Sequence, residues 1–234
     1  MNWTASSRTL ISSFLLLAGC AAAPRTAVDP EALSTGRKWV VEDGGSARVG
    51  FHHGVLDIDA PAGITLWYRS VLIGPIEIEF DATAVSAGGP NDQVSDLNVF
   101  WMATNPDGSA PMTPARSSGR FEAYNDMLTY YVGLGGNRNT TTRFRRYIGD
   151  PQVRPLLPEH DLSAPDTLLV PNRRQHITLI ANGSHIEYRR DGRVLFAFED
   201  SSPYTRGWFA LRTTRSHLRI ENLRIRQLAP SASR

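Results

Sequence analysis

Short runs in which apolar and polar residues alternate recur along the chain from Trp39 almost to its C-terminus. A two-residue period predicts strands that bury one face, because successive side chains of a strand point to opposite sides. The clearest runs are residues 55–58, 64–68, 76–80, 97–101, 128–132, 176–180, 185–188, 194–198, 208–211 and 218–225. No segment carries a sustained helical period, so the pattern predicts an all-β fold.

Turn signals separate the clearest of these runs. Asn182-Gly183 and Asp191-Gly192 each stand between two alternating runs, and such dipeptides are strong signals for β-hairpins. Many short strands joined by turns are typical of antiparallel sandwiches. The chain has no repeat of fixed period and no interior linker. We therefore expect one antiparallel β-sandwich of the jelly-roll type over residues 37–230, followed by a short tail at 231–234.

The first 19 residues have the pattern of an export signal. Arg8 precedes an apolar centre at residues 10–17, and small residues lead to Cys20, the one cysteine of the chain. The ending Leu17-Ala18-Gly19-Cys20 resembles the lipobox of bacterial lipoproteins, in which the cysteine is lipidated and becomes the first mature residue. The alternative is an ordinary secretory signal that ends by chance at a cysteine.

The lipobox resemblance implies a location and a domain plan. It implies a protein of the bacterial cell envelope that meets the membrane through its lipid anchor only, and Ala21 in place of aspartate implies sorting to the outer membrane. Residues 20–36, rich in alanine, proline and threonine, would then form a tether. No stretch after Cys20 is long and apolar enough to span a bilayer.

The charge of the chain is nearly balanced but unevenly distributed. It has 25 Lys+Arg against 23 Asp+Glu, a net charge of +2, which does not indicate a nucleic-acid partner. Acids predominate in residues 20–115 and arginines in residues 116–234, and Lys38 is the only lysine. The arginine excess reflects either a GC-rich genome or recognition of carboxylates, which match the guanidinium fork.

Two resemblances bear on the ligand class. Residues 171–228, with their two hairpins, Gly207-Trp208-Phe209 and a closing strand, resemble the end of concanavalin-A-like jelly rolls, the lectin and glucanase superfamily. Residues 96–101, Gly135-Gly136-Asn137 and residues 140–147 are similar to an uncharacterised bacterial family that accompanies polysaccharide-degradation genes. Together they cover roughly residues 39–228 and imply a jelly roll with glycans as the ligand class, but they carry over no catalytic residues.

The densest candidate site is residues 120–147, which combine tyrosine, asparagine and arginine with several glycines. Alternation assigns Tyr130 to the core face of its strand and Tyr131 to the opposite, concave face, where folds of this kind bind sugars. Aromatic rings stack on sugars, and arginine and asparagine bind hydroxyls or carboxylates. Asp96 and Asn98 likewise share one face of a strand, either as groove-lining groups or as a solvated surface.

These residues lead to a first hypothesis, an enzyme that cleaves an acidic, uronate-containing polysaccharide or oligosaccharide by β-elimination. Arg143, Arg146 and Asn98 would neutralise the uronate carboxylate, and Tyr131 and His217 would serve as base and proton donor. We therefore expect Asn98, Tyr131, Arg146 and His217 to meet on one face. The predicted substrate-binding residues are Trp101, Arg120, Tyr124, Asn137, Arg143 and Arg212.

Three alternatives remain at this stage. The same surface could belong to a glycan-binding lipoprotein without catalysis. The protein could also be a purely structural component of the envelope. A glycoside hydrolase could use Glu77 and Asp81, which share a strand face, although a solvated outer face explains these acids as well. No histidine pair has the spacing of a zinc site, and no cofactor is predicted, while loop aspartates leave a structural calcium ion open.

Overall fold

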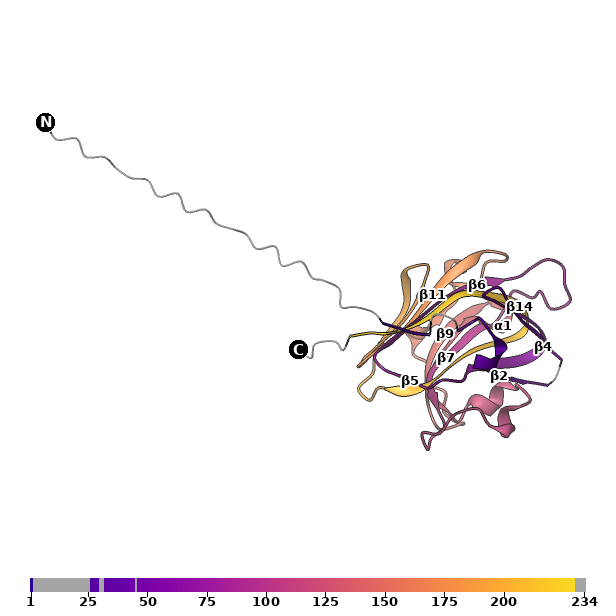
Figure 1. Cartoon of the computed structure of the whole chain (residues 1–234), viewed down its shortest axis with the longest axis horizontal. Coiled ribbons are helices and arrows are strands. Elements are labelled where there is room, and N and C mark those ends of the chain that lie inside the picture. Colours follow the sequence, from indigo (N-terminus) through magenta and orange to yellow (C-terminus); the bar gives the residue numbers. More distant parts are fainter. Residues whose placement is uncertain (2–25, 30–31, 45, 230–234) are drawn as a thin grey trace.

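A computed structural model of the chain describes residue 1 and residues 26–29, 32–44 and 46–229. The described residues form one antiparallel sheet of 14 strands that curls around a shared core (Figure 1). The strands are β1 (Thr26–Asp29), β2 (Trp39–Asp43), β3 (Arg48–His52), β4 (Val55–Tyr68), β5 (Leu72–Ile73), β6 (Ile76–Ala84), β7 (Leu97–Thr104), β8 (Leu128–Gly135), β9 (Thr141–Ile148), β10 (Asp161–Leu162), β11 (Arg174–Asn182), β12 (His185–Arg190), β13 (Arg193–Glu199) and β14 (Arg206–Gln227). The short helical turns are η1 (Gly36–Lys38), η2 (Pro114–Arg116), η3 (Phe121–Tyr124), α1 (Gly136–Asn139), η4 (Pro158–His160) and η5 (Pro165–Thr167).

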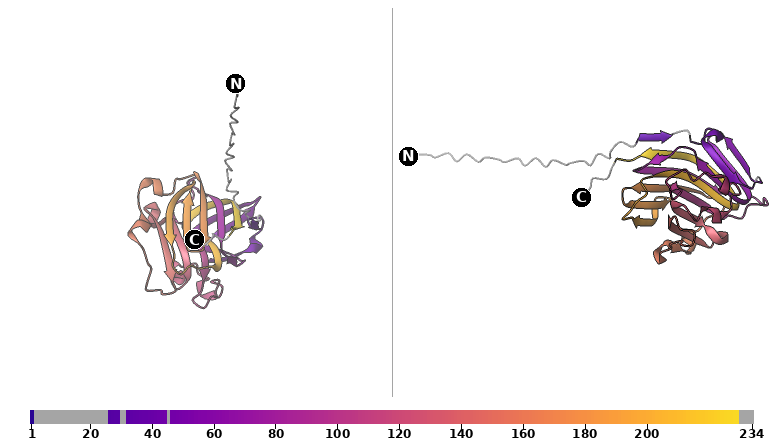
Figure 2. Two further views of the ribbon diagram at one scale, coloured as in Figure 1. Left: turned by 90° about the vertical axis from the view of Figure 1, so that its left-hand side faces the viewer. Right: turned by 90° about the horizontal axis from the view of Figure 1, so that it is seen from below.

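The long strand β14, drawn in yellow, belongs to both layers of the sandwich (Figures 1 and 2). Its first part pairs with β7, which leads through β8 and β9 to β10; we call this half the front sheet. Its later part pairs with β6, which leads through β11 and β12 to β13; we call this half the back sheet. A register shift between Thr214 and Ser216, opposite β4, marks the point where the strand changes sheet. Such an irregularity bends a strand without ending it, so the strands expected at 208–211 and 218–225 are one continuous strand.

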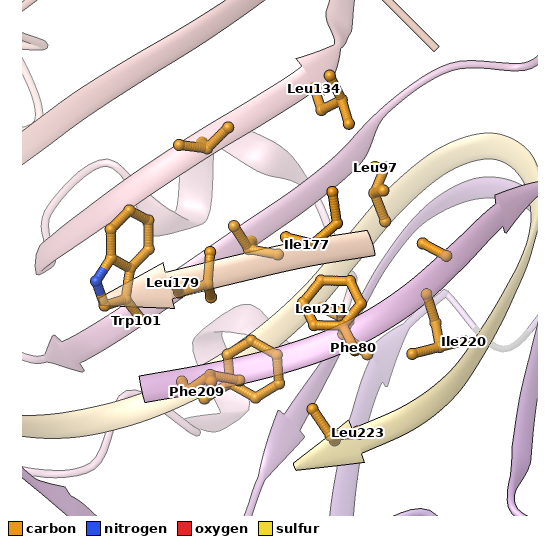
Figure 3. Close-up of a cluster of buried hydrophobic side chains, with 14 of the residues drawn as sticks. Phe80, Leu97, Trp101, Leu134, Ile177, Leu179, Phe209, Leu211, Ile220 and Leu223 are labelled. Atoms are coloured by element: carbon orange, nitrogen blue, oxygen red, sulfur yellow. The ribbon is translucent and has the colours of Figure 1, made fainter. Parts of the chain in front are cut away.

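The space between the two sheets is filled by their inward-facing apolar side chains. One buried cluster contains Trp101 and Leu134 of the front sheet together with Phe80, Leu179 and Ile220 of the back sheet (Figure 3). The prediction of an antiparallel β-sandwich is confirmed. Both predicted hairpins are also confirmed, because β11 pairs with β12 and β12 with β13 across the Asn-Gly and Asp-Gly turns.

A second apolar cluster lies on the outer face of the front sheet, the face turned away from this core. It consists of Trp67, Phe100, Ala103, Tyr124, Met127, Tyr131, Tyr147, Trp208 and Ala210. Tyr124 and Met127 come from the connection between β7 and β8, residues 105–127, whose helical turns lie at the bottom of Figure 1. This connection, which we call the cover loop, therefore buries part of the outer face.

The structured domain begins earlier than the sequence predicts. Thr26–Asp29 pairs with the end of β14, and Ala32 and Leu33 are buried in the core. The indole of Trp39 donates a hydrogen bond of 2.9 Å to the carbonyl of Ala32. The predicted boundary at residue 37 is therefore wrong for these residues, because their backbone completes the sheet edge. Residues 2–25, which include the predicted signal, lie outside the described residues.

Candidate functional site

A cavity of about 790 Å³ opens on the outer face of the front sheet, beside the cover loop. We call it the arginine pocket. It is lined by Gln93, Ser95, Asp96, Asn98, Phe121, Tyr131, Gly133, Gly136, Asn137, Arg138, Thr141, Arg143, Arg145, Arg154, Arg212, Thr214 and Arg215. The volume is within the range of small-molecule sites, roughly 300–1,000 Å³.

Strand register brings the floor of the pocket together. Asn98 of β7 stands opposite Gly133 of β8 and opposite Arg212 of β14. Tyr131 of β8 stands opposite Arg145 of β9. Because alternate residues of a strand share one face, these side chains continue the same surface as Phe100 and Tyr147 beneath the cover loop. The pocket is thus the uncovered part of the outer face.

Tyr131 lies at the centre of this floor and is 7% exposed. A Cβ atom at Gly133 would stand 2.5 Å from the Tyr131 hydroxyl and 3.1 Å from Asn98 Oδ1, so the glycine leaves room for both polar atoms. Burial, followed by the neighbouring Tyr147 and Asp96, raises the pKa of Tyr131, which keeps its hydroxyl protonated. The Tyr131 ring is also 5.6 Å from that of Phe121.

Asp96 and Asn98 add two polar side chains beside Tyr131. Asn98 is 3% exposed, and its Oδ1 has no hydrogen-bond partner among the described residues. Its amide donates a 3.4 Å hydrogen bond to Asp96. Burial raises the pKa of Asp96, against the lowering effects of Ser95, Asn98 and Arg212. Asp96 is the only carboxylate among the lining residues.

Arg212 is the most buried arginine of the pocket, at 2% exposure. Its Nη1 donates to Thr65 Oγ1 at 2.9 Å and to the carbonyl of Gly119 at 2.8 Å. Its guanidinium carbon lies 4.9 Å and 5.0 Å from the ring centres of Phe121 and Tyr124. Its Nε is buried and has no hydrogen-bond partner among the described residues.

The other arginines surround this centre. Arg145 donates to the backbone carbonyls of Arg154 and Pro155. Arg154 donates to Tyr147 Oη at 3.1 Å, and Arg143 pairs with Asp161 at 2.7 Å. Arg138 and Arg215 are exposed at the mouth of the pocket. Six arginines against a single lining carboxylate give the pocket a positive potential.

One rim of the pocket is a backbone turn of unusual hand. Asn137, Arg138 and Asn139 have φ angles of 53°, 60° and 60°, in the left-handed region, so α1 is not a right-handed helix. The Asn139 side chain holds the turn by bonding to both the N–H and the carbonyl of Leu169. A left-handed arginine is costly, roughly 1–2 kcal/mol, and this turn presents Arg138 to the pocket.

The structure brings five of the predicted site residues together in this pocket: Asn98, Tyr131, Asn137, Arg143 and Arg212. It also adds Arg154, which lies outside the candidate block at residues 120–147, and it selects Arg145 and Phe121 from within that block. Alternation along β9 from Arg143 identifies Arg145. We find no sequence signal for Arg154, and none for Phe121 beyond its place in the candidate block, because both reach the pocket from loops.

Arg146 and His217 do not join the pocket, so the expected meeting of four catalytic residues is wrong. Arg146 is on the opposite side of β9, where it pairs with Asp200 at 2.6 Å and lies over the Tyr204 ring. His217 pairs with Asp57 at 3.1 Å and Asp92 at 3.4 Å, beyond the bend of β14.

Three predicted substrate-binding residues also have other places. Trp101 is fully buried in the core against Tyr130, as its alternation with Leu97 and Val99 indicates. Tyr124 is fully buried too, and its hydroxyl donates to Glu42 at 2.8 Å, which fastens the cover loop to the sheet. Arg120 is exposed outside the pocket, with Glu122 3.9 Å away. Cys20, predicted to be lipidated, lies outside the described residues.

The carboxylates of β6 lie on the outer face of the back sheet, away from the pocket. Glu77 is 3.3 Å from Arg226, and Asp81 is 2.7 Å from His176. Their partners lie on the adjacent strands, so both acids form ion pairs on this face, and Glu77, at 4% exposure, is buried and not solvated. Neither Glu77 nor Asp81 lines the arginine pocket, and the described residues that do line it lack the second carboxylate that a hydrolase needs.

Within the described ranges, no group of three or more His, Cys, Asp or Glu side chains is placed to hold a metal ion. The structural calcium ion stays a prediction. None of the helices in the described part of the chain is long and apolar enough to cross a membrane.

Comparisons with known proteins agree on the fold. A family described as "Domain of unknown function (DUF6250)" matches residues 58–223. A comparison with curated proteins finds no match. Among solved structures, a Bacillus subtilis protein of unknown function with a galectin-like fold is similar, with a TM-score of 0.67 and 14% identity over 88% of this chain and 97% of that one.

Two further solved structures are carbohydrate-binding proteins by their names. The carbohydrate-binding module CBM66 from Bacillus subtilis is similar with a TM-score of 0.54 and 12% identity, over 80% of this chain and 94% of that one. The exoplasmic domain of VIP36, bound to Ca²⁺ and Man3GlcNAc, is similar with a TM-score of 0.53 and 10% identity, over 85% of this chain and 87% of that one. These likenesses confirm the jelly-roll fold, which the sequence predicts.

Proposed function

This chain belongs to the DUF6250 family, and we propose that its arginine pocket binds acidic glycans through their carboxylate groups. The observation that carries the proposal is the composition of the pocket: six arginines, one carboxylate, and buried polar atoms of Asn98 and Arg212 that lack partners. A buried polar atom without a partner costs about 1–3 kcal/mol. A ligand that supplies the missing partners would recover part of that cost.

The chemistry of the lining residues favours a sugar acid over a simple anion. The rings of Tyr131 and Phe121 give the pocket an aromatic wall, and Asn98 and Asn137 offer amide groups to sugar hydroxyls. Guanidinium groups bind carboxylates as a two-pronged fork. CBM66 and VIP36, whose names record carbohydrate or mannose-glycan binding, support the glycan part of the proposal through their shared fold.

β-Elimination on the bound uronate is the second candidate function, and the position of Asp96 beside Tyr131 favours it over hydrolysis. As a carboxylate, Asp96 would take the proton from the carbon next to the uronate carboxyl. The electron pair forms a carbon–carbon double bond while the bond to the glycosidic oxygen breaks, and that oxygen takes the proton of the Tyr131 hydroxyl. Arginines beside the carboxylate would stabilise the developing negative charge.

We also propose that the domain works at the bacterial envelope. This rests on the lipobox-like ending at Cys20. A lipid anchor would keep a captured or cleaved glycan close to the cell, and it suits binding and cleavage equally.

The test of the proposal uses two arginines at the mouth of the pocket. Arg138 and Arg215 are exposed, so changing both to methionine should leave the fold intact. Isothermal titration with oligogalacturonate, oligomannuronate, oligoguluronate and glucuronate-containing glycans should show binding that weakens at least about tenfold in this double variant. The matched control changes Arg120 and Arg224, two exposed arginines outside the pocket, and should bind as the parent does. Equal loss in both variants, or no binding by the parent, would contradict the proposal.

A further inference from the structure

The arginine pocket is walled on three sides and open on the fourth. On the basis of the proposed function, we infer that it receives the end of an acidic glycan chain and excludes the interior of a long chain. An open groove across a sheet lets a polymer pass through and leave at both ends. A pocket with one mouth requires that a chain terminate inside it.

The first wall closes the pocket along the strand direction. The surface that carries Tyr131 continues along β7 and β8 to Phe100, and there the cover loop lies directly upon it. The Tyr124 ring stacks on Phe100 at 5.6 Å, and the Phe121 ring stands 5.6 Å from that of Tyr131. Phe100 and Tyr124 are fully buried. A sugar chain therefore cannot run on beyond Phe121.

The second wall closes the side toward β4. Gly119 of the cover loop lies so close to the backbone of Gly63 that a Cβ atom at either glycine would collide with the other residue's carbonyl oxygen. Arg212 donates to the Gly119 carbonyl at 2.8 Å from the sheet. Backbone in direct contact with backbone leaves no passage for a ligand on this side.

The third wall closes the side toward β9. The segment after β9 returns across the pocket edge, where Arg145 donates to the carbonyls of Arg154 and Pro155. The guanidinium carbon of Arg154 then lies 5.0 Å from the centre of the Phe121 ring. This contact joins the segment after β9 to the cover loop, so the first and third walls meet.

The walls are fastened in place. Arg116, 3% exposed, donates to the carbonyls of Pro111 and Ala123 and to the side chains of Asn105 and Asp126, at 2.6–2.8 Å. These bonds tie the two ends of the cover loop to its middle. A loop held this way should not open to admit a polymer.

The fourth side is the mouth, which Asn137, Arg138 and Arg215 surround as exposed side chains. The terminal sugar would sit on Tyr131, and the next sugars would pass between these arginines into solvent. The amount of protein bound by a long glycan would then depend on its number of chain ends and not on its length.

The test is the stoichiometry of binding along a ladder of chain lengths. The parent protein is titrated with oligogalacturonate, oligomannuronate and oligoguluronate, each as oligomers of defined length from two to about ten sugars, and with the long polymer of each. We expect one protein per glycan chain at every length, and a polymer capacity that rises when the same mass of polymer is cut into shorter chains. A stoichiometry that grows in proportion to chain length would overturn the chain-end inference and leave the proposed function standing. Absence of binding to all probes would overturn the proposed function itself, and the inference with it.

Discussion

The hydroxyl of Tyr131 occupies the space above Gly133, two residues along the same strand, so that a Cβ atom at Gly133 would stand 2.5 Å from the oxygen. Asn98 Oδ1 shares this space from the neighbouring strand, at 3.1 Å from the same position. The absence of a side chain at one residue therefore determines where two polar groups of the pocket floor lie.

Gly133→Ala should displace the Tyr131 hydroxyl and weaken glycan binding at least about tenfold, which corresponds to about 1.4 kcal/mol. The added methyl group also costs about 1–3 kcal/mol of stability as overpacking, less what the strand gains by losing a glycine. Titration calorimetry and thermal unfolding measure the two effects. Gly44→Ala is the control, because nothing lies within 4 Å of a Cβ there. Unchanged affinity in Gly133→Ala would show that the hydroxyl position is unimportant.

Arg212→Met should lower both stability and binding. It removes the two hydrogen bonds from Nη1, leaving the Gly119 carbonyl without this donor, at a cost of about 1–3 kcal/mol. For a chain of this size that is a fall in melting temperature of several degrees. Arg215→Met, at the exposed mouth, should weaken binding while stability stays within about 0.5 kcal/mol. Equal stability of the two variants would contradict the structural role assigned to Arg212.

Asp96→Asn should stabilise the protein at neutral pH. Burial raises the pKa of Asp96 in the folded state, so the folded protein holds this proton more tightly than the unfolded chain does. The resulting stability is fully present below the ordinary aspartate pKa and is lost as the pH rises through the raised value. The free energy of unfolding, measured with urea, should therefore be higher for the variant than for the parent at pH 7. This difference should disappear near pH 3. A variant less stable than the parent at pH 7 would contradict the assigned burial cost.

The same variant separates binding from cleavage. Removing the one lining carboxylate removes a repulsion against an anionic ligand, so the affinity for a uronate oligosaccharide at pH 7 should rise, by roughly fivefold. If the pocket cleaves by β-elimination, Asp96→Asn should at the same time abolish the ultraviolet absorbance of the unsaturated product. Parent protein that binds uronates without any new absorbance acts as a binding protein only.

Arg138→Gly should raise stability by about 1 kcal/mol and weaken binding, since glycine adopts the left-handed conformation without strain. His53→Gly is the matched control: His53 has a φ of 52° in a turn outside the arginine pocket. It should gain similar stability and keep its affinity. Unfolding curves and titrations of both variants test this. A loss of stability in Arg138→Gly would show that the arginine is not strained. Unchanged binding would show that the strain serves no ligand.

Strand alternation carried most of what the sequence could predict. It assigned Tyr131 and Tyr130 to opposite faces and grouped Asp96 with Asn98, and the structure has these residues as expected. The same rule applied to Trp101 indicates the core, yet its aromatic character favoured a sugar-binding role that its burial excludes.

Alternation gives the face of a side chain but not its position along a bent strand. His217 faces away from the core as expected, but the shift between Thr214 and Ser216 carries it beyond the pocket to Asp57 and Asp92. Arg146 is one residue from Arg145 and therefore on the wrong side of β9. The two walls formed by Phe121 and Arg154 depend on how loops return over the sheet, and no local pattern encodes that path.

The most direct test of the central claim compares one uronate oligosaccharide with its carboxyl-reduced counterpart, which has the same linkages but no charge. Titration calorimetry at one salt concentration measures the affinity of the parent protein for both. We expect the acidic form to bind and the reduced form to bind at least about tenfold more weakly, because the arginines lose their carboxylate partner. Equal affinity for both forms would contradict carboxylate recognition by the arginine pocket.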